Sequence, residues 1–497
     1  MVLALDIGTS STRSAIYDAT GRRFMATTAQ FGYPLLTGQD GRAELRPADL
    51  DRAVARSIGV TLQKWRELSA PSPIAGIGVS CFWHSLLGLD GAGRAITPIY
   101  TWADSRCKQE AKFLRENQGE TRLHEQTGCM ARTSFWPAKL LWLRQAEPAL
   151  FRQVVRWVSP AEWIQERWCG RATASLSMAS GTGLLDEKKG GWHPSLLKLC
   201  RLDETRLNPI SDAPSTVSAA SAKRFPELAQ APWHPALGDG AASNLGSGAT
   251  APGSAAINVG TSAALRVVVK AATPHRPAPF GLFSYRIDGP RRLVGGAVSN
   301  AGNLRAWALR ELNLPADPAK IEKLLRARST PVAGLVLLPF WMAERAPTWP
   351  EDLPSAVIGI TQATTALDLL QTLQEATYHR LAQIADAVEK AAQRKLSFIV
   401  SGGIQRSSNA LQRLANVLDR PVCASLEPEA SLRGAACLVL ERLDLAPPAP
   451  GSGPIIRPQA KAARAYAAAR NRQIGLEALL RMGGPDHPEK RPPTADD

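Results

Sequence analysis

Near its N-terminus the chain reads Leu3-Ala4-Leu5-Asp6-Ile7-Gly8-Thr9-Ser10-Ser11-Thr12-Arg13, and a similar stretch returns as Ile257-Asn258-Val259-Gly260-Thr261-Ser262-Ala263-Ala264-Leu265-Arg266. Each copy predicts an apolar strand, a turn of small residues and a second apolar strand. Such a turn exposes backbone N–H groups and suits a phosphate. Because each copy opens a long segment of alternating strand and helix patterns, the repeat predicts two α/β domains that face one polyphosphate. Two unrelated hairpins are the alternative.

Length and composition narrow the class of protein. The 497 residues fit two domains of about 200–250 residues better than one core. Hydrophobic residues make up 44% and charged residues 21%, as in ordinary soluble proteins. Apolar stretches stay far below the ~20 residues of a membrane helix, so we expect no membrane association. The chain starts at once with a strand, so we expect no signal or transit peptide.

Cysteine usage and charge indicate a compartment and partners. Seven widely spaced cysteines without a Cys-x-x-Cys pair predict free thiols in a reducing cytoplasm. The net charge of +15 invites a nucleic-acid hypothesis, but the basic residues are scattered and form no recognisable module. We therefore expect no nucleic-acid partner, and a basic field that attracts an anionic nucleotide or an acidic substrate.

A Gly-rich passage at 238–253 divides the halves without a long linker, so we expect domains at 1–245 and 246–445 in contact through a hinge. The pattern predicts helices at 160–168 after Ser159 and at 365–392. The remainder, 446–497, reads as a Pro/Gly-rich extension with a helix near 460–482 and a disordered end.

Asp6 ends the first predicted strand, directly before the small-residue turn. A carboxylate there repels phosphate but can hold a hydrated Mg²⁺ that bridges the phosphates. A turn-capping aspartate is the alternative, and the neighbours Gly8, Thr9 and Thr12 favour the metal role.

Asp239 lies in Leu237-Gly238-Asp239-Gly240-Ala241, where small neighbours leave its carboxylate open to another molecule. Between the two halves, such an aspartate suits a general base that takes a proton from an alcohol. It is also the second candidate Mg²⁺ ligand. Phosphoryl transfer asks for little more than an aligned hydroxyl, a held metal and neutralised charge. Taken alone, Gly-Asp-Gly is an ordinary loop.

The stretch Ser401-Gly402-Gly403-Ile404-Gln405-Arg406-Ser407-Ser408 follows a buried strand and opens a helix. Glycines there let the backbone approach a flat base or sugar, and a helix N-terminus favours an anion. This context suits a nucleotide contact as well as it suits a plain turn.

Together, and in this order, these motifs resemble the FGGY carbohydrate kinase family, which has the actin/hexokinase-like (ribonuclease H-like) ATPase fold. The resemblance covers about residues 2–443, with further matches at Leu338-Pro339, Glu344-Arg345-Ala346-Pro347 and Glu429-Ala430-Ser431-Leu432-Arg433-Gly434-Ala435-Ala436. It implies two α/β ATPase domains with a cleft between them. It also implies an ATP- and Mg²⁺-dependent kinase that phosphorylates an alcohol group of a sugar, with Asp239 as catalytic base and Asp6 supporting the metal.

The same resemblance assigns the nucleotide contacts. The phosphates would lie on the first turn, made by Gly8, Thr9, Ser10, Ser11, Thr12 and Arg13, and on Gly260 and Thr261 of the second. The nucleotide cleft would be lined by Gly302, Gly402, Gly403 and Ser407.

The family's sugar site lies largely in the first domain, and here it is expected at residues 80–87 and 99–106. Trp83 or Trp102 could stack on a carbon chain, while His84, Asp104 and Arg106 could hydrogen-bond hydroxyl groups. Arg132 and Lys139 could meet a carboxylate, although Lys139 suits a surface cap equally.

The stretches His84-Ser85-Leu86-Leu87, Thr101-Trp102-Ala103-Asp104-Ser105-Arg106 and Ser299-Asn300-Ala301-Gly302-Asn303 are similar to the gluconate-kinase branch. Phe82-Trp83 and the stretch 127–137 depart from that branch. Gluconate is therefore the first expected substrate, and xylulose or another ketose or polyol is the alternative. An actin- or chaperone-like ATPase without a sugar substrate is more remote. The oligomeric state stays open, a homodimer included.

Overall fold

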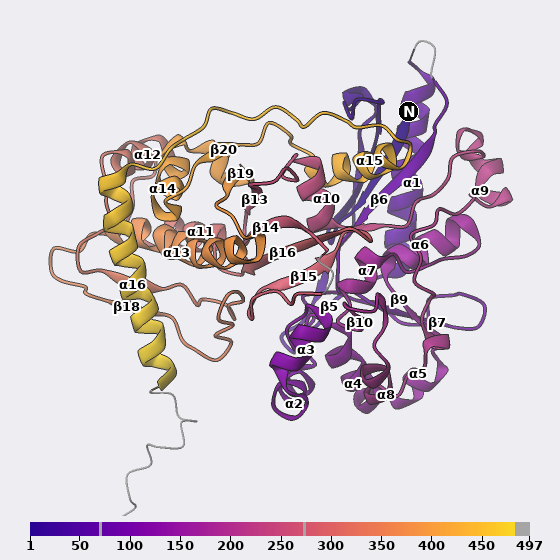
Figure 1. Ribbon diagram of the computed structural model, residues 1–497, viewed down its shortest axis with the longest axis horizontal. Coiled ribbons are helices and arrows are strands. Elements are labelled where there is room, and N and C mark those ends of the chain that lie inside the picture. Colours follow the sequence, from indigo (N-terminus) through magenta and orange to yellow (C-terminus); the bar gives the residue numbers. More distant parts are fainter. Residues whose placement is uncertain (69–71, 272–274, 483–497) are drawn as a thin grey trace, which may run out of the picture. The chain divides into compact units, whose positions relative to one another are not determined.

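The computed structural model describes residues 1–68, 72–271 and 275–482, and it divides the chain into two compact units (Figure 1). The first unit contains Met1–Pro252, Arg266–Val294 and Leu426–Gly451, and the second contains Gly253–Leu265, Gly295–Ser425 and the chain from Ser452 onward. Compactness thus assigns two later segments to the first unit, whereas the boundaries after residues 245 and 445 follow sequence order and stay a prediction. The disorder expected at 483–497 lies outside the described residues.

The main sheet of the first unit has the strand order β12-β6-β1-β2-β3. Its strands are β1 (Val2–Ile7), β2 (Ser11–Tyr17), β3 (Ala29–Gly32), β6 (Gly76–Cys81) and β12 (Leu237–Gly238). β1 and β2 form an antiparallel hairpin, whereas β1, β6 and β12 run parallel. Because parallel strands end at the same edge of a sheet, whatever follows β1, β6 and β12 gathers there.

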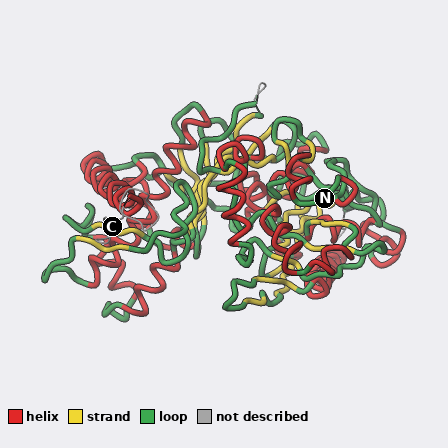
Figure 2. The backbone as a smooth tube through the Cα atoms, turned by 90° about the horizontal axis from the view of Figure 1, so that it is seen from below, coloured by secondary structure: helices red, strands yellow, loops and turns green. Residues whose placement is uncertain are grey.

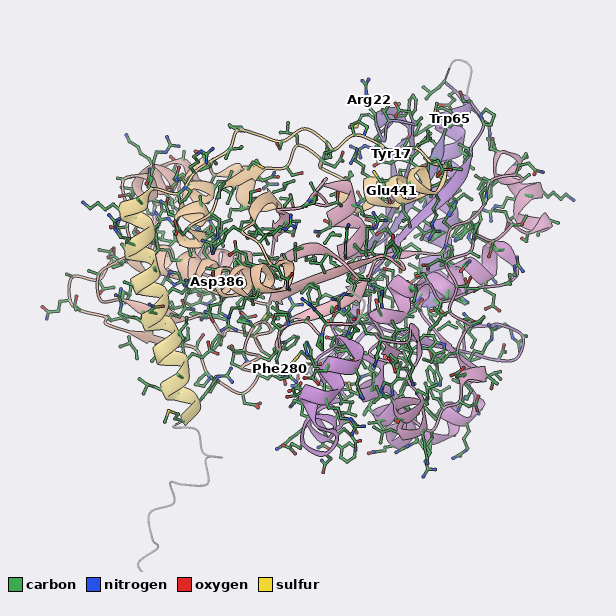
Figure 3. All side chains as sticks on the ribbon, in the orientation of Figure 1. Tyr17, Arg22, Trp65, Phe280, Asp386 and Glu441 are labelled. Carbon is green, nitrogen blue, oxygen red and sulfur yellow. The ribbon has the colours of Figure 1, made fainter. Side chains whose placement is uncertain are left out.

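Both faces of this sheet are covered, because successive residues of β1 point to opposite sides and both sets are buried. Leu3 and Leu5 pack in the core that includes helix α1 (Pro47–Arg66), whose apolar residues recur as Leu50, Val54, Ile58 and Leu62. Val2 and Ala4 pack with Tyr17 against helix α15 (Ala430–Arg442) on the other face (Figure 3).

The first unit holds further short elements. Helix α6 (Pro160–Cys169) begins with a capping box between Ser159 and Glu162 and ends at Gly170 in the left-handed region, which confirms the predicted helix. The remaining elements are β4 (Leu36–Thr37), β5 (Ala43–Leu45), β7 (Leu87–Leu89), β8 (Ile99–Tyr100), α2 (Lys108–Gln118), α3 (Glu120–Thr127), α4 (Trp136–Ala146), α5 (Pro148–Gln153), β9 (Arg156–Val158), α7 (Leu176–Ser180), β10 (Leu185–Asp186), β11 (Gly191–Trp192), α8 (Pro194–Leu199), α9 (Ala219–Arg224), α10 (Asp239–Gly246) and β15 (Phe283–Arg286).

A second sheet has the order β15-β16-β14-β13-β19-β20, and the division between the units falls within β14 and β16. Its further strands are β13 (Ser254–Val259), β14 (Ala263–Lys270), β16 (Arg291–Val298), β19 (Ser397–Ser401) and β20 (Val422–Ala424). β13 and β19 run parallel. The hairpin with a parallel neighbour that β1, β2 and β6 form is therefore repeated by β13, β14 and β19.

Helices surround the strands of the second unit (Figure 2). Helix α13 (Ala366–Ala392) begins with a capping box between Thr365 and Asp368, which confirms the long helix predicted there. The other elements are α11 (Gly302–Glu311), α12 (Pro318–Arg326), β17 (Val336–Leu338), β18 (Ala356–Ile358), α14 (Ser408–Leu418) and α16 (Ala460–Met482).

The predicted C-terminal helix, α16, is an integral part of the second unit. Glu477 of α16 pairs with fully buried Arg380 of α13 at 2.6 Å. Asp386 of α13, labelled in Figure 3, pairs with Arg470 at 3.1 Å, and Tyr466 donates to buried Glu375. Removing α16 would take away the carboxylate partner of fully buried Arg380, at a cost of several kcal/mol. Among the described residues, we find no helix that combines the length and the apolar character of a membrane span.

Candidate functional site

Asp6 occupies the carboxyl end of β1, where the parallel register places it opposite Ser80 of β6. The Ser80 hydroxyl donates a 2.7 Å hydrogen bond to Asp6 Oδ1. Burial raises the pKa of Asp6 to about 6; the Ser80 bond opposes this rise, and the negative charge of Asp239 adds to it. Asp6 is thus a half-buried carboxylate, and a cation beside it would stabilise its charged form.

Asp239 is the first residue of α10 and directly follows β12, whose Gly238 lies opposite Cys81 of β6. With β6 between β12 and β1, the backbones at Asp239 and Asp6 are roughly 10 Å apart, two strand spacings. Burial raises the pKa of Asp239, while the positive charge of Arg266 and the Gly240 N–H, 2.7 Å from Asp239 Oδ1, oppose this rise. The first unit therefore brings the two predicted carboxylates to one sheet edge.

Helix α7 fixes the turn that carries Asp239. Ser177 Oγ accepts from the Gly238 N–H at 3.0 Å, and Ser177 O accepts from Trp83 Nε1 at 2.9 Å. A Cβ on Gly238 would lie 1.7 Å from Trp83 Cε2, so only glycine fits between the indole and the base. Trp83, 5% exposed, thus packs directly against the turn.

His84 stands in a cluster of aromatic rings next to this turn. Its ring centroid lies 5.4 Å from that of Tyr285 and 4.8 Å from that of Phe135, and Tyr285 also lies 4.8 Å from Trp83. His84 has a φ of 67°, which is uncommon for a residue with a Cβ and is typical of functional loops. Its Nδ1 contacts the Gly181 carbonyl. His84 is more exposed than Trp83, Tyr285 and Phe135.

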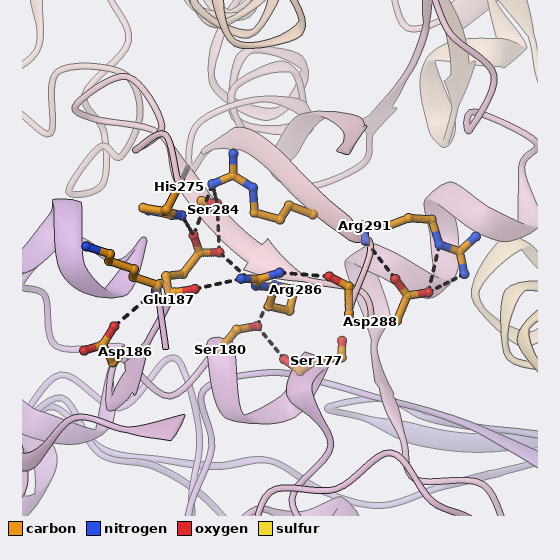
Figure 4. Close-up of polar contacts among 12 residues, drawn as sticks. Ser177, Ser180, Asp186, Glu187, His275, Ser284, Arg286, Asp288 and Arg291 are labelled. Atoms are coloured by element: carbon orange, nitrogen blue, oxygen red, sulfur yellow. Dashed lines mark hydrogen bonds and ion pairs between the residues drawn. The ribbon is translucent and has the colours of Figure 1, made fainter. Parts of the chain in front are cut away.

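A buried ionic cluster connects β15, which carries Tyr285, to the region of α7. Glu187, 1% exposed, pairs with Arg292 at 3.1 Å and accepts from Ser284. The Arg286 N–H donates to Ser180 Oγ, which donates to Ser177 O, each at 2.8 Å (Figure 4). Ser177 therefore joins the aromatic cluster to the Asp239 turn.

Asp104 and Arg106, predicted to bind hydroxyl groups, bind each other. Asp104 is 1% exposed; its Oδ2 accepts from Arg106 Nη2 at 2.7 Å and from the Ala43 N–H at 3.1 Å. Arg106 also pairs with Glu44, and its guanidinium lies 4.5 Å from the centroid of Trp142. These polar groups are engaged within the protein, and a direct role at the substrate stays a prediction.

Two further candidates from the sequence also have internal partners. Lys139, 1% exposed, donates to the carbonyls of Asp104 and Thr133, and burial lowers its pKa. Arg132 pairs with Glu120.

The first small-residue turn is closed by its own hydrogen bonds. Gly8 N–H donates to Ser11 O at 2.9 Å, Tyr33 donates from its hydroxyl to Gly8 O, and Thr12 is fully buried beside that hydroxyl. The exposed residue of the turn is Ser10. Trp102, 38% exposed, donates from Nε1 to Thr9 Oγ1 at 3.1 Å. At the far end, Arg13 pairs with Glu429 at 2.8 Å.

The second unit contains a cavity of about 910 Å³. Its lining includes five of the predicted nucleotide contacts: Gly260, Thr261, Gly302, Gly403 and Ser407. Gly402 lies beside it with a φ of +91°, and a Cβ there would approach Val259 O to 2.4 Å. A Cβ on Gly302 would approach Gly260 O equally closely. Glycines thus let three backbone segments meet at the wall of a cavity large enough for a nucleotide-sized ligand.

The cavity is also lined by residues that were not predicted from the sequence. Ser407 Oγ donates to Glu322 at 2.6 Å, and Glu322 pairs with Arg305 at 3.1 Å. Tyr378 of α13 contributes a buried ring, and Arg406 lines the wall from an exposed position. Tyr378 occupies an ordinary apolar position of a long helix, so no local signal distinguished it.

The donor set suits one metal in particular. Among the described residues, no three His, Cys, Asp or Glu side chains converge as a metal cluster. Asp6 and Asp239 supply two carboxylates, and Mg²⁺ is usually held by one or two carboxylates together with waters and substrate phosphates. The residues therefore fit Mg²⁺ better than a metal that needs a full protein cage.

Comparison with known proteins accords with this geometry. A gluconokinase of Bacillus licheniformis is 25% identical over 457 residues, 88% of this chain and 87% of its own. A xylulose kinase of Escherichia coli (strain K12) is 25% identical over 428 residues, 84% of each chain. The crystal structure of xylulose kinase from Lactobacillus acidophilus matches with a TM-score of 0.88 at 24% identity, covering 97% of this chain and 98% of that one, which shows a shared fold.

The family itself is shown by two domain matches. The N-terminal domain of the FGGY family of carbohydrate kinases matches residues 1–246, and the C-terminal domain matches residues 255–440. The predicted family, two-domain α/β fold and enzyme class are thereby confirmed. The chain belongs to the FGGY family of carbohydrate kinases, phosphotransferases that act on hydroxyl groups.

Proposed function

We propose that this kinase transfers the terminal phosphate of ATP to a hydroxyl group of a small sugar acid, with gluconate as the first candidate. The observation that carries the proposal is Asp239, a carboxylate at the end of β12 whose pKa is raised and whose neighbours are glycine and alanine. A raised pKa makes the ionised carboxylate a better base toward an alcohol. The gluconokinase of B. licheniformis, similar over most of both chains, supports the choice of acceptor.

Asp239 accepts the proton of the acceptor hydroxyl as that oxygen bonds to the terminal phosphorus of ATP, and the bond from this phosphorus to the bridging oxygen breaks so that ADP leaves. The Gly240 N–H orients one carboxylate oxygen, and Ser177 holds the turn through the Gly238 N–H. Asp6 and Asp239 would hold Mg²⁺, and its charge would offset that of the nucleotide phosphates.

The nucleotide occupies the cavity of the second unit in this proposal. Its base or ribose lies along Gly402 and Gly403, near Tyr378, and its phosphates lie toward Gly260 and Thr261. The N–H groups and hydroxyls of the first turn, Gly8 to Thr12, and Arg13 are further candidate phosphate contacts.

The acceptor lies beside the aromatic cluster of the first unit, where His84 is a half-buried polar group. Trp83 acts by supporting Gly238, while Asp104 and Arg106 act by shaping the loop that carries Trp102.

Xylulose is the second candidate acceptor, because a xylulose kinase is as similar as the gluconokinase. The family match leaves no support for an actin- or chaperone-like ATPase.

The test is a coupled ADP assay over gluconate, xylulose, glycerol and related sugars, with the product identified by ³¹P NMR. We expect the highest kcat/KM with gluconate or another aldonic acid and a phosphomonoester as product. A preference for a neutral ketose or polyol, or ADP formation that needs no acceptor, would overturn the proposal.

A further inference from the structure

Arg266 of β14 is a half-buried cation in the first unit with unused hydrogen-bonding groups. Its Nε is buried and donates to no acceptor, and within the described part of the chain its terminal nitrogens have no protein acceptor either. Outside the sheet, the backbone carbonyl of Arg266 accepts a hydrogen bond from Asn244 Nδ2 at 3.2 Å. Since a guanidinium carries five N–H donors, such a side chain is costly to bury unless a ligand completes it.

The position of Arg266 is set by the turn that carries the base. A Cβ built on Gly240 would lie 2.9 Å from Arg266 Nε and 2.8 Å from Trp83 Cζ3. The guanidinium therefore lies against the residue that follows Asp239, and next to Trp83. The negative charge of Asp239 and the nearby Tyr285 partly oppose the effect of burial, which lowers the pKa of Arg266.

The other cations of this region are already paired with protein groups. Arg286 donates to the carbonyls of Glu187 and Gly289 (Figure 4), and the remaining ones are Arg13 with Glu429, Arg106 with Asp104, Arg132 with Glu120, and Lys139 with backbone carbonyls. Among these cations and within the described residues, Arg266 is the one whose side chain donates to no protein acceptor, so a ligand can engage it without displacing a protein group.

An anionic acceptor needs such a cation. A substrate carboxylate would enter near Asp6 and Asp239, and like charges at short range in a partly buried site repel strongly. The planar fork of a guanidinium matches a carboxylate with two parallel hydrogen bonds. A neutral ketose or polyol has no group that would gain as much from this pairing.

Building on the proposed function, we propose that Arg266 binds the carboxylate of a sugar acid and so selects anionic acceptors over neutral sugars and polyols. Arg266 is then the specificity-determining residue of the acceptor site.

The test compares acceptors across matched variants. Arg266→Gln is expected to lower kcat/KM for gluconate roughly 100-fold, mostly through KM, because the buried carboxylate loses its partner. The neutral acceptors xylulose and glycerol should change less than about fivefold, and Arg266→Lys should fall between the wild type and Arg266→Gln. Lys270→Gln, an exposed charge change on the same strand, should behave as the wild type.

Calorimetry gives a readout without turnover. Wild-type protein should bind gluconate at least about tenfold more tightly than its uncharged amide, and Arg266→Gln should abolish that difference. If Arg266→Gln fails to fold, Arg266→Lys provides the same comparison, and its preference for gluconate over the amide should be smaller than that of the wild type. A urea unfolding transition like that of the wild type checks folding of the variant, and titration with ADP checks the nucleotide cavity of the second unit.

Several outcomes overturn the inference. Equal loss on charged and neutral acceptors would show that Arg266 acts through Asp239 or the phosphate, and unchanged selectivity would show no role in selection. If the wild type phosphorylates gluconate and Arg266→Gln still prefers gluconate over neutral acceptors, the role of Arg266 is refuted but the proposed function stands. If the wild type prefers neutral acceptors, the proposed function fails with it.

Discussion

The two sheet edges of this kinase are built from the same backbone pattern but carry different chemistry. In the first unit, Ser80 lies opposite Asp6 and donates to it at 2.7 Å. In the second, Ser401 lies opposite Asn258 and accepts from it at 2.9 Å. The following turns close alike, since the glycine N–H of each donates at 2.9 Å to a serine carbonyl within the turn.

At equivalent positions the first edge has the carboxylate of Asp6 and the second has the amide of Asn258. This difference distinguishes the proposed roles of the two edges. Around Asp6 and Asp239 the first edge holds negative charge, which suits a cation and a proton acceptor. At the equivalent position the second edge has the uncharged amide of Asn258, and glycines border the cavity of about 910 Å³. In the proposed function the repeated motif gives an acceptor edge with carboxylates and a nucleotide edge with an amide, and exchanging their residues should break this division.

The largest effect should follow removal of the base. Asp239→Asn should lower kcat about a thousandfold, because an amide cannot accept the proton of the acceptor hydroxyl. Binding of ADP in the absence of Mg²⁺ should change less than about threefold, since the cavity lies in the second unit. The coupled ADP assay and calorimetry measure these two quantities. Glu204→Gln, an exposed change of the same kind, serves as control; activity of Asp239→Asn within tenfold of the wild type would refute the assignment.

The next largest effect should follow from replacing Asp6 of the first edge with asparagine, the residue type found at position 258 of the second edge. Asp6→Asn keeps a partner for Ser80 but removes a charge, so kcat should fall roughly 10- to 100-fold and the Mg²⁺ requirement should rise. Rates measured over a range of Mg²⁺ concentrations test this. A variant with an unaltered Mg²⁺ dependence would exclude Asp6 from the metal site.

The same variant should change the pH dependence of stability. The pKa of Asp6 rises from 3.8 to about 6 on folding, so the folded state binds the proton more tightly. The resulting stability is fully present below about pH 4 and is lost as the pH rises through 6. Asp6→Asn should therefore be more stable than the wild type by about 1–3 kcal/mol at pH 7.5, and close to it at pH 4. Urea unfolding at both pH values measures the difference; a constant offset would contradict a raised pKa.

The smallest effect should come from the reciprocal exchange. Asn258→Asp adds a charge near the proposed phosphate contacts and should raise KM for ATP about tenfold, with little change in KM for the acceptor. Asn117→Asp, the same exchange at an exposed position of α2, controls for net charge. If both variants bind ATP as the wild type does, the second edge does not face the phosphates.

The repeat could be read from the sequence because its signal is local. A strand, a small-residue turn and a strand follow one another directly from Val2 to Tyr17 and from Ser254 to Lys270, and that pattern predicts two α/β domains. The family is predicted from a resemblance that several motifs carry together. Asp6 and Asp239 could be singled out for the same reason, since each stands at a strand end among small residues. Their roles stay predictions.

The contacts that could not be predicted from the sequence join residues that lie far apart along the chain. Arg266 gains its meaning from the closeness of Gly240 and Trp83, and Tyr285 reaches the cluster through β15. The register of β5 and β8 places Glu44 opposite Tyr100, and the Glu44 side chain then pairs with Arg106. Local sequence spacing does not predict these contacts, because strand register depends on the whole sheet.

The most direct test is a crystal structure of the protein with gluconate, Mg²⁺ and a non-hydrolysable ATP analogue. We expect a gluconate hydroxyl oxygen about 2.6–3.2 Å from an Asp239 carboxylate oxygen, and the nucleotide beside Gly403 and Tyr378. An acceptor bound elsewhere, with Asp239 facing no hydroxyl group, would contradict the account.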